Sequence, residues 1–363
     1  MEGSVIDKGE TRKGHAWHLR VFVGRDGDGK RKYVSQTFYG TRKQAEKELR
    51  RLLGEKDGLS VVTNETFANY YERWLDVYST TVRPSTFRVV KSYAKNYFIP
   101  LLGNKKMTKI NTLDIQGVVN HMIKAGVSSV SISNSVAILG AAFRQAVEWG
   151  MVVKSPVQGV KLPKLVKAAV MPFTQEEVKQ ILDVSRFDHY GIFYRFAVET
   201  GCRPGEILAL QWSDVDYERR VVRITKTLSY VDGKMYVNPT KTKSGVRSIP
   251  LSSRLVTDLK RLYVKTTDRD GYVFVNEGGK PINGGVLERK FKKILEKAKL
   301  PTTHRLYDLR HTCATLLLLG GEHPKIVSER LGHASVSITL DTYSHVLPTM
   351  QEQATSTLER MLD

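Results

Sequence analysis

The chain has 363 residues, of which 41% are hydrophobic, and this is enough for two or three domains with hydrophobic cores of their own. Its formal net charge of +20 at pH 7 indicates an acidic partner, and nucleic acid is the commonest one. No run of about 18 apolar residues occurs and residues 1–10 are polar, so we expect no transmembrane helix, no membrane partner and no signal peptide.

Residues 1–60 are predicted to form a small sheet backed by one helix. Polar and apolar residues alternate over 15–23 and again over 32–39, with a turn between them, which is typical of a β-hairpin. An amphipathic helix is predicted over 42–53. A β-ribbon fits the major groove of DNA, so the basic residues of the hairpin are candidate DNA contacts. The alternative is a basic hairpin whose charged side chains are simply solvated. The candidate contacts are Arg20, Arg25, Lys30, Arg31 and Lys32.

Residues 64–160 are predicted to form an all-helical domain, because apolar residues recur there at helical spacing. The predicted helices cover residues 66–78, 84–98, 112–122 and 128–149. Pro100 and Gly103 are expected to end the second helix. Residues 155–167, rich in lysine and proline, are predicted to be an interdomain linker. The basic residues expected to contact DNA are Arg83, Arg88, Lys91 and Lys95.

The region 170–363 contains a first candidate phosphate ligand at a helix start. Gly201 is expected to end one helix and Pro204 to begin the next, which places Arg203 at the N-cap. Helix N-termini attract anions through their free N–H groups and the helix dipole, so Arg203 is well placed to hold a phosphate. Glu206, three residues later, is expected to steady Arg203.

Two lysines follow in a predicted connection between strands. Residues 221–227 and 234–238 alternate as strands, and residues 240–250 are expected to turn from one strand to another. Lys241 and Lys243 lie two residues apart, so on an extended strand they would face the same side. A lysine at this position could also belong to a basic loop that only contacts the DNA backbone.

A second arginine lies at the start of another predicted helix. Arg310 is a candidate phosphate ligand near the beginning of this helix, three residues after Tyr307. His311, the next residue, is expected to face elsewhere on the helix and to pack or hydrogen-bond there.

A histidine and a tyrosine complete the set. Residues 324–331 form a predicted short helix closed by Gly332, and His333 follows at the turn. The next helix, from about residue 335, carries Tyr343, ten positions after His333. Apolar residues at helical spacing over 350–362 predict an amphipathic end helix.

Two arginines, a histidine and a tyrosine can break a phosphodiester without a metal ion. Guanidinium groups match the non-bridging phosphate oxygens, and a tyrosine hydroxyl can attack phosphorus and hold the broken strand covalently. The segments around Arg203, Arg310 and His333–Tyr343, in this order, resemble those of the tyrosine recombinases, the phage integrase family. The resemblance covers nearly the whole chain and is greatest to integrases of temperate phages and conjugative transposons.

This resemblance implies roles for the residues. Tyr343 would attack the scissile phosphate, form a 3′-phosphotyrosine link and release a 5′ hydroxyl. Arg203 and Arg310 would stabilise the transition state, and His333 would assist through a hydrogen bond or proton transfer.

The resemblance also assigns the proton donor and exposes one departure. A hairpin lysine, Lys241 in preference to Lys243, would protonate the departing 5′ oxygen. The family usually has histidine or lysine three residues before the second arginine, and Tyr307 stands there in this chain. Its hydroxyl could still donate a hydrogen bond, but a phenol cannot act as a histidine does.

The resemblance further implies an α+β fold of three domains. These are an arm-type DNA-binding domain over 1–60, a helical core-binding domain over 64–160, and a mixed catalytic domain over 170–363 with a small antiparallel sheet and a tail helix. The implied partner is double-stranded DNA at core and arm-type sites, bound by a homotetramer joined through the tail helix. An excision factor or a DNA-bending host protein is a further candidate partner.

No cofactor and no metal ion are expected, because DNA bond energy is kept in the phosphotyrosine and neither a glycine-rich phosphate loop nor a metal-ligand cluster is present in the sequence. Cys202 and Cys313 lack a zinc-binding spacing and are typical of a protein of the reducing cytoplasm. Two alternatives are a type IB topoisomerase, which uses the same chemistry as a monomer, and a non-enzymatic DNA-binding regulator. The N-terminal module and the tail helix argue against the first, and the four candidate catalytic residues argue against the second.

Overall fold

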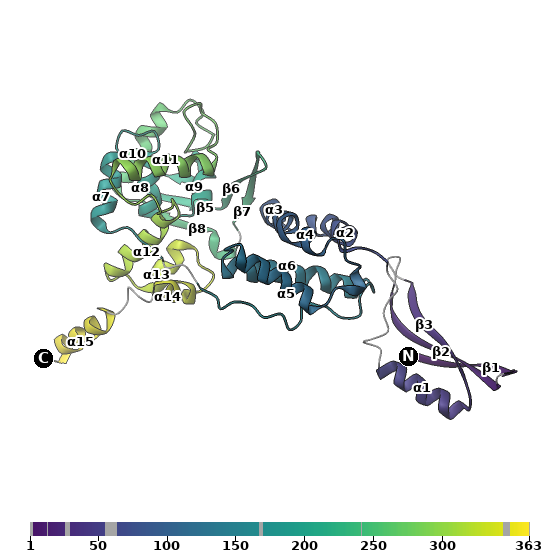
Figure 1. Ribbon diagram of the computed structural model, residues 1–363. Coiled ribbons are helices and arrows are strands. Elements are labelled where there is room, and N and C mark those ends of the chain that lie inside the picture. Colours follow the sequence, from purple (N-terminus) through teal and green to yellow (C-terminus); the bar gives the residue numbers. More distant parts are fainter. Residues whose placement is uncertain are drawn as a thin grey trace. The chain divides into compact units, whose positions relative to one another are not determined.

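The computed structural model divides into two compact units, Met1–Lys167 and Ala168–Asp363 (Figure 1). It describes residues 3–12, 14–25, 30–54, 64–166, 170–240, 242–343 and 349–362. Across these ranges, helices are combined with small antiparallel sheets, so the fold is of the predicted α+β class. None of the helices described has the length and apolar character that a membrane span needs.

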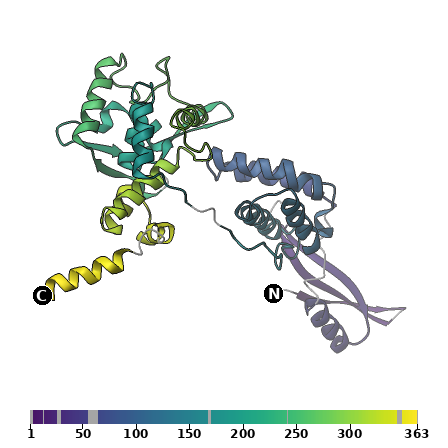
Figure 2. The ribbon, with the colours of Figure 1, turned by 60° about the vertical axis from the view of Figure 1, so that its left-hand side comes forward.

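The N-terminal sheet has three strands in the order β1-β2-β3, with α1 against one face (Figure 1, Figure 2). The elements are β1 (Gly3–Thr11), β2 (Gly14–Arg25), β3 (Arg31–Tyr39) and α1 (Arg42–Gly54). The alternation in β2 buries Trp17, Leu19 and Val21 against Ala45 and Leu52 of α1, as the hairpin pattern predicts. The strand β1 is not evident from the sequence, because its register to β2 shifts between Asp7 and Glu10 and interrupts the alternation.

The helical part of the first unit closely follows the predicted helices. The elements are α2 (Phe67–Ser79), α3 (Pro84–Tyr93), η2 (Ala94–Phe98), α4 (Ile99–Leu102), η3 (Met107–Lys109), α5 (Thr112–Lys124) and α6 (Ser129–Glu148). Pro100, contrary to expectation, does not end the second helix. The turn η2 is a π-helix in which the N–H of Ile99 donates to the carbonyl of Ala94, five residues back. This wider turn accommodates the proline ring, and the chain stays helical to Leu102.

The segment expected to be a linker is attached to the helices of the first unit as far as Val166, whose N–H donates to Oγ of Ser129 on α6 (3.0 Å). Gln116 of α5 accepts a hydrogen bond from the N–H of Lys161 (2.8 Å) and donates one to its carbonyl (3.1 Å). Val157 and Val160 pack against the buried core of the helices. The lysine and proline content predicted an interdomain linker, and the boundary between the two units does fall after Lys167. The two valines and the paired backbone groups attach the segment to the first unit.

The second unit combines helices and short strands around one large core. Its helices are α7 (Gln175–Val184), α8 (Gly191–Thr200), α9 (Pro204–Leu208), η4 (Trp212–Asp214), η5 (Lys243–Gly245), α10 (Ser253–Lys265), α11 (Gly284–Lys297), α12 (Asp308–Leu319), α13 (Pro324–Leu331), α14 (Val336–Tyr343) and α15 (Thr349–Leu362). Its strands are β4 (Val215–Asp216), β5 (Val221–Ile224), β6 (Lys226–Val231), β7 (Lys234–Pro239) and β8 (Arg247–Pro250).

The predicted strand over 221–227 is in fact two strands in two sheets. β5 pairs with β4 and β8, whereas β6 pairs with β7, and the change occurs at Thr225. Val222, Ile224 and Leu228 are all buried, so the apolar residues stay in phase through the change of partner. Periodicity therefore could not reveal it, because a strand's alternation does not depend on which strand it pairs with.

Candidate active site

Arg203 lies between two helices whose ends are determined by local sequence. Gly201 ends α8 in the left-handed conformation (φ 65°), and Pro204 occupies the first position of α9, so Arg203 is the N-cap as predicted. A side chain at Gly201 would also collide with Leu331, because a Cβ built there lies 2.6 Å from that leucine. The conformation and the close packing both require glycine at this position.

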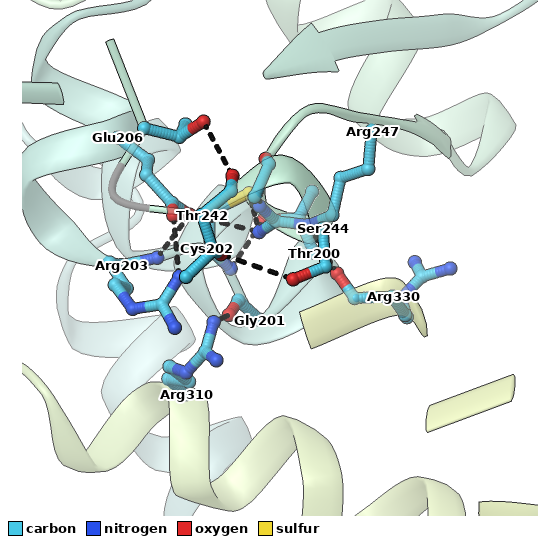
Figure 3. Close-up of polar contacts among 12 residues, drawn as sticks. Thr200, Gly201, Cys202, Arg203, Glu206, Thr242, Ser244, Arg247, Arg310 and Arg330 are labelled. Carbon is cyan, nitrogen blue, oxygen red and sulfur yellow. Dashed lines mark hydrogen bonds and ion pairs between the residues drawn. The ribbon is translucent and has the colours of Figure 1, made fainter. Parts of the chain in front are cut away.

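Glu206 links Arg203 to a second arginine, Arg247 (Figure 3). Its carboxylate accepts hydrogen bonds from the N–H and Nη1 of Arg203 at 3.0 and 2.7 Å, and from Nη2 of Arg247 at 2.9 Å. Glu206 is only 3% exposed. Burial raises the pKa of Glu206, but the hydrogen bond and charge of Arg247 outweigh burial, so its pKa lies below the ordinary value. The expectation that Glu206 steadies Arg203 agrees with this geometry.

Arg247 is a residue of the site that the sequence analysis did not single out. It lies on β8, and besides Glu206 it donates from Nε to the carbonyl of Arg330 (2.6 Å) and from Nη1 to that of Gly245 (3.0 Å). One signal could have indicated it. Residues two apart on a strand face the same side, and Ile249, two positions later, is apolar and buried.

Arg310 is almost fully buried, at 2% exposure, in the first turn of α12. Its Nη1 donates to the carbonyl of Gly201 (2.8 Å), which brings it next to the start of α9 (Figure 3). Among the described residues its buried Nη2 has no hydrogen-bond partner. Burial, and then the charge of Arg203, lower the pKa of Arg310. A buried cation with an unused donor beside a second guanidinium is suited to bind an anion.

His333 lies at the turn after α13, as predicted, because Gly332 ends that helix in the left-handed conformation (φ 69°). Its Nδ1 is 2.8 Å from Oγ1 of Thr339 on α14. Burial lowers the pKa of His333 to about 4, with further contributions from Arg310 and Arg203. The ring is therefore neutral at pH 7 and lies within the field of both arginines.

Tyr343 is the last described residue of α14 and is 1% exposed. Its ring packs against α12 and α13, and its Oη lies 2.8 Å from Nδ1 of His311. Burial raises the pKa of Tyr343, and Arg310 opposes this shift in part. The expectation that His311 faces away from the site is therefore wrong, because the packing of α14 on α12 brings the tyrosine to it.

Tyr307 precedes α12 at its N-cap position and is 39% exposed. It contributes to the electrostatic surroundings of Arg203, Arg310 and Tyr343, and its ring lies 5.2 Å from that of His311. The residue that departs from the family pattern thus lies among the other candidates. A catalytic role for its hydroxyl remains a prediction.

The two candidate lysines are placed differently. Lys241 lies outside the described residues. Lys243 is exposed and begins the short 3₁₀ turn η5, so the argument that two residues on one strand face the same side does not apply to it. The choice between Lys241 and Lys243 therefore stays a prediction.

The candidate DNA contacts lie on the first unit. On the sheet, the guanidinium of Arg20 stacks 4.3 Å from the ring centroid of Tyr33, and the side chain of Arg25 is outside the described residues. Lys30, Arg31 and Lys32 are exposed. On the helical part, Arg88, Lys91 and Lys95 are exposed and Arg83 is half-buried.

Comparisons with known proteins match this chain to tyrosine recombinases. A family model described as the phage integrase family matches residues 172–350, and one described as the phage integrase N-terminal SAM-like domain matches residues 66–123. A curated relative, a tyrosine recombinase XerC-like protein of Caldanaerobacter subterraneus subsp. tengcongensis, is 31% identical over 94% of this chain and 95% of its own length.

Solved structures share the fold. The Tn1549 transposon integrase in complex with transposon right end DNA matches 82% of this chain and 100% of its own, with a TM-score of 0.71 and 22% identity. A lambda integrase tetramer bound to a Holliday junction matches 91% of this chain and 95% of its own, with a TM-score of 0.60 and 18% identity.

The Glu206–Arg247 contact generates a stability prediction. Arg247→Met should lower the free energy of unfolding at pH 7 by about 3 kcal/mol, because it removes one partner of a buried carboxylate. Urea unfolding followed by circular dichroism measures this. Arg254→Met is the matched control: that arginine is 60% exposed in its ion pair with Asp258, so its loss should cost under about 1 kcal/mol.

The same contact predicts a pH dependence. The pKa of Glu206 is lowered in the folded protein, so its stabilisation is complete above the unfolded pKa of about 4.3 and is lost as the pH falls through the folded pKa. The difference in free energy of unfolding between the wild type and Arg247→Met should therefore be largest near neutral pH and should shrink on acidification. Equal stability of the two proteins at pH 7 would contradict the assignment.

Proposed function

The chain belongs to the phage integrase family of tyrosine recombinases, and we propose that it uses Tyr343 to cut and rejoin DNA when a mobile element is integrated or excised. It is a site-specific DNA recombinase, an enzyme that breaks and rejoins DNA strands. The observation that carries the assignment of residues is the convergence of Arg203, Arg310, His333 and Tyr343, from segments far apart in the sequence, around a buried guanidinium with an unused donor.

In the proposed reaction Oη of Tyr343 attacks the scissile phosphorus as the bond to the 5′ oxygen breaks. The product is a 3′-phosphotyrosine, and the 5′ hydroxyl of the partner duplex reverses the step. Arg203 and Arg310 hold the non-bridging oxygens, and one such preorganised donor contributes about 3 kcal/mol to transition-state stabilisation. Their positions are set before DNA binds, through Glu206 and the Gly201 carbonyl, so little reorganisation is needed.

The remaining roles follow the same chemistry. His333, neutral and close to both arginines, donates a hydrogen bond to the phosphate from the ring nitrogen that Thr339 does not engage. Lys241, or else Lys243, protonates the departing 5′ oxygen. Tyr307 donates a weaker hydrogen bond near the phosphate than the family's usual histidine would.

We propose that the chain has three domains, two of which carry a surface that binds DNA. The domain over 1–60 binds arm-type DNA with the outer face of its sheet, where Arg20 stacks on Tyr33. The domain over 64–160 binds the core site with the basic residues of α3 and η2. The domain over 170–363 carries out the chemistry. An excision factor or a DNA-bending host protein would bias the direction of recombination.

We also propose that four copies act together on two duplexes in the cytoplasm. Support comes from the shared fold with a lambda integrase tetramer on a Holliday junction, and from α15, where Leu358, Met361 and Leu362 are 59%, 78% and 83% exposed. An apolar helix face of this kind can dock on a neighbouring copy. This assembly favours a recombinase over a monomeric type IB topoisomerase.

The nucleophile is tested by Tyr343→Phe. The variant should bind core DNA as the wild type does and form no covalent complex, since only the hydroxyl is lost. Incubation with a labelled core duplex followed by denaturing electrophoresis detects the covalent band. Tyr236→Phe, which alters a tyrosine on β7, is the control and should retain the band. A covalent band from Tyr343→Phe would exclude Tyr343 as the nucleophile.

The arm-binding role is tested on the sheet. Arg20→Ala should weaken binding to arm-type DNA by about 1 kcal/mol or more and leave core-site cleavage unchanged. Arg42→Ala, on α1 and 76% exposed in its ion pair with Glu46, is the matched control. Binding is measured by electrophoretic mobility shift at fixed salt, because phosphate contacts depend on ionic strength. Unchanged arm binding by Arg20→Ala, and by a protein lacking residues 1–60, would refute the proposal.

The tail helix is tested with Leu358→Asp/Met361→Asp. Charges on its apolar face should prevent synapsis of two duplexes and strand exchange, while binding to one core site persists. Glu359→Ala, on the same helix and also exposed, should behave as the wild type. If the doubly substituted protein assembles and recombines normally, α15 does not join the protomers.

A further inference from the structure

The hydrogen bond between His311 and Tyr343 is a feature of the site that the proposed roles leave unused. Nδ1 of His311, on α12, lies 2.8 Å from Oη of Tyr343, on α14, and the two ring centroids are 5.8 Å apart. These residues are 32 positions apart in the sequence, so only the packing of α14 on α12 brings them together. The contact involves the atom that must lose a proton in the reaction.

The attacking phenol needs a proton acceptor. Tyr343 is 1% exposed, and burial raises its pKa, so the phenolate is not populated at neutral pH. Its proton must therefore leave as the bond to phosphorus forms. In the part of the chain that the structure describes, the hydrogen bond of Oη is to His311.

His311 is in the right protonation state to accept a proton. Burial lowers its pKa, with Asp308 opposing and Arg310 and Arg305 adding to the shift, so the ring is neutral near pH 7. In the tautomer with hydrogen on Nε2, the free Nδ1 accepts the hydrogen bond that the phenol donates.

We infer that His311 is the general base that takes the phenolic proton of Tyr343 during strand cleavage and returns it during rejoining. This inference rests on the proposed role of Tyr343 as nucleophile. The Oη–phosphorus bond forms as the phosphorus–O5′ bond breaks, the phenolic proton moves to Nδ1 of His311, and O5′ takes a proton from Lys241 or Lys243. In rejoining, the 5′ hydroxyl returns its proton to the lysine and the departing Tyr343 oxygen takes its proton back from His311.

The other side chains of the site fit this role less well. His333 has its Nδ1 at Thr339, and the ring is assigned to the phosphate. Tyr307 contacts the His311 ring edge to face, at 5.2 Å and 68°, and being a phenol it is a poor acceptor for the proton of another phenol.

Several titratable or charged groups face His311, and they influence its pH response. They are Asp308 and Arg310 of α12, Arg305 and Tyr307 before that helix, His333 after α13 and Tyr343 of α14. Because burial and the arginines lower the pKa of His311, the base stays available at mildly acidic pH and is lost only when the ring becomes protonated.

The test compares His311→Asn and His311→Phe in the full-length protein. Asparagine can place an amide oxygen near the position of Nδ1 and keep the hydrogen bond, but it cannot take a proton, whereas phenylalanine keeps only the ring. The rate of covalent complex formation is measured in a single turnover on a nicked core duplex, from about pH 6 to pH 9. DNA binding and thermal unfolding of each variant are measured alongside.

Both variants should bind core DNA normally and cleave it about 100-fold or more slowly at pH 7, as expected for loss of a general base. Their rates should rise about tenfold per pH unit, because cleavage then depends on the phenolate. His189→Asn, an exposed histidine of the same unit, should cleave as the wild type does.

Three outcomes would overturn the inference. A wild-type rate for His311→Asn would mean that the hydrogen bond only positions the phenol. Faster cleavage by His311→Phe would mean that the contact holds Tyr343 back. A slow rate with the wild-type pH profile would mean that His311 acts through packing. Failure of the nucleophile itself is separate, because Tyr343→Phe would then still form a covalent complex at every pH.

Discussion

The buried carboxylate of Glu206 is the constraint on which the active site depends. A carboxylate in this position is stable only with its hydrogen bonds made, and it makes them to the backbone and side chain of Arg203 and to Arg247. Arg247, on β8, in turn donates to carbonyl groups of η5 and α13, so one acidic side chain connects α9 to these elements through Arg247. The carbonyl of Gly201, at the end of α8, accepts a hydrogen bond from Arg310 and so holds the second guanidinium close by. The two guanidinium groups are therefore held before any phosphate arrives, which is what electrostatic preorganisation requires.

The tyrosine of this site belongs to the hydrophobic core as well as to the chemistry. Tyr343 packs with Ala314, Leu318, Val327 and Leu331, so the short helix α14 is held against α12 and α13 by the residue that it presents. Burial of the phenol keeps it protonated and unreactive in the absence of DNA. If Tyr343 is the nucleophile, as proposed, it depends on its neighbours for activation, and His311 is the side chain hydrogen-bonded to its hydroxyl.

Much of this arrangement could be predicted because it is local. The N-cap position of Arg203 follows from a glycine and a proline within three residues of it, and the turn that presents His333 follows from Gly332 immediately before it. The inward face of β2 follows from simple alternation. In each case the conformation depends on steric or backbone interactions between residues within one turn of the chain. Such interactions can be inferred directly from the neighbouring residues in the sequence.

The sequence by itself thus determined the α+β class, most of the helices and the candidate residues for the chemistry, whereas tertiary packing decided how those residues are paired. The partner of His311 depends on how α14 packs on α12, and the role of Arg247 depends on which strand β5 pairs with. The same is true of Gln116, which holds the chain beyond the helices. Periodicity tells which side of an element is buried, but it contains no information about what lies opposite, because that is settled by contacts between segments far apart in the chain.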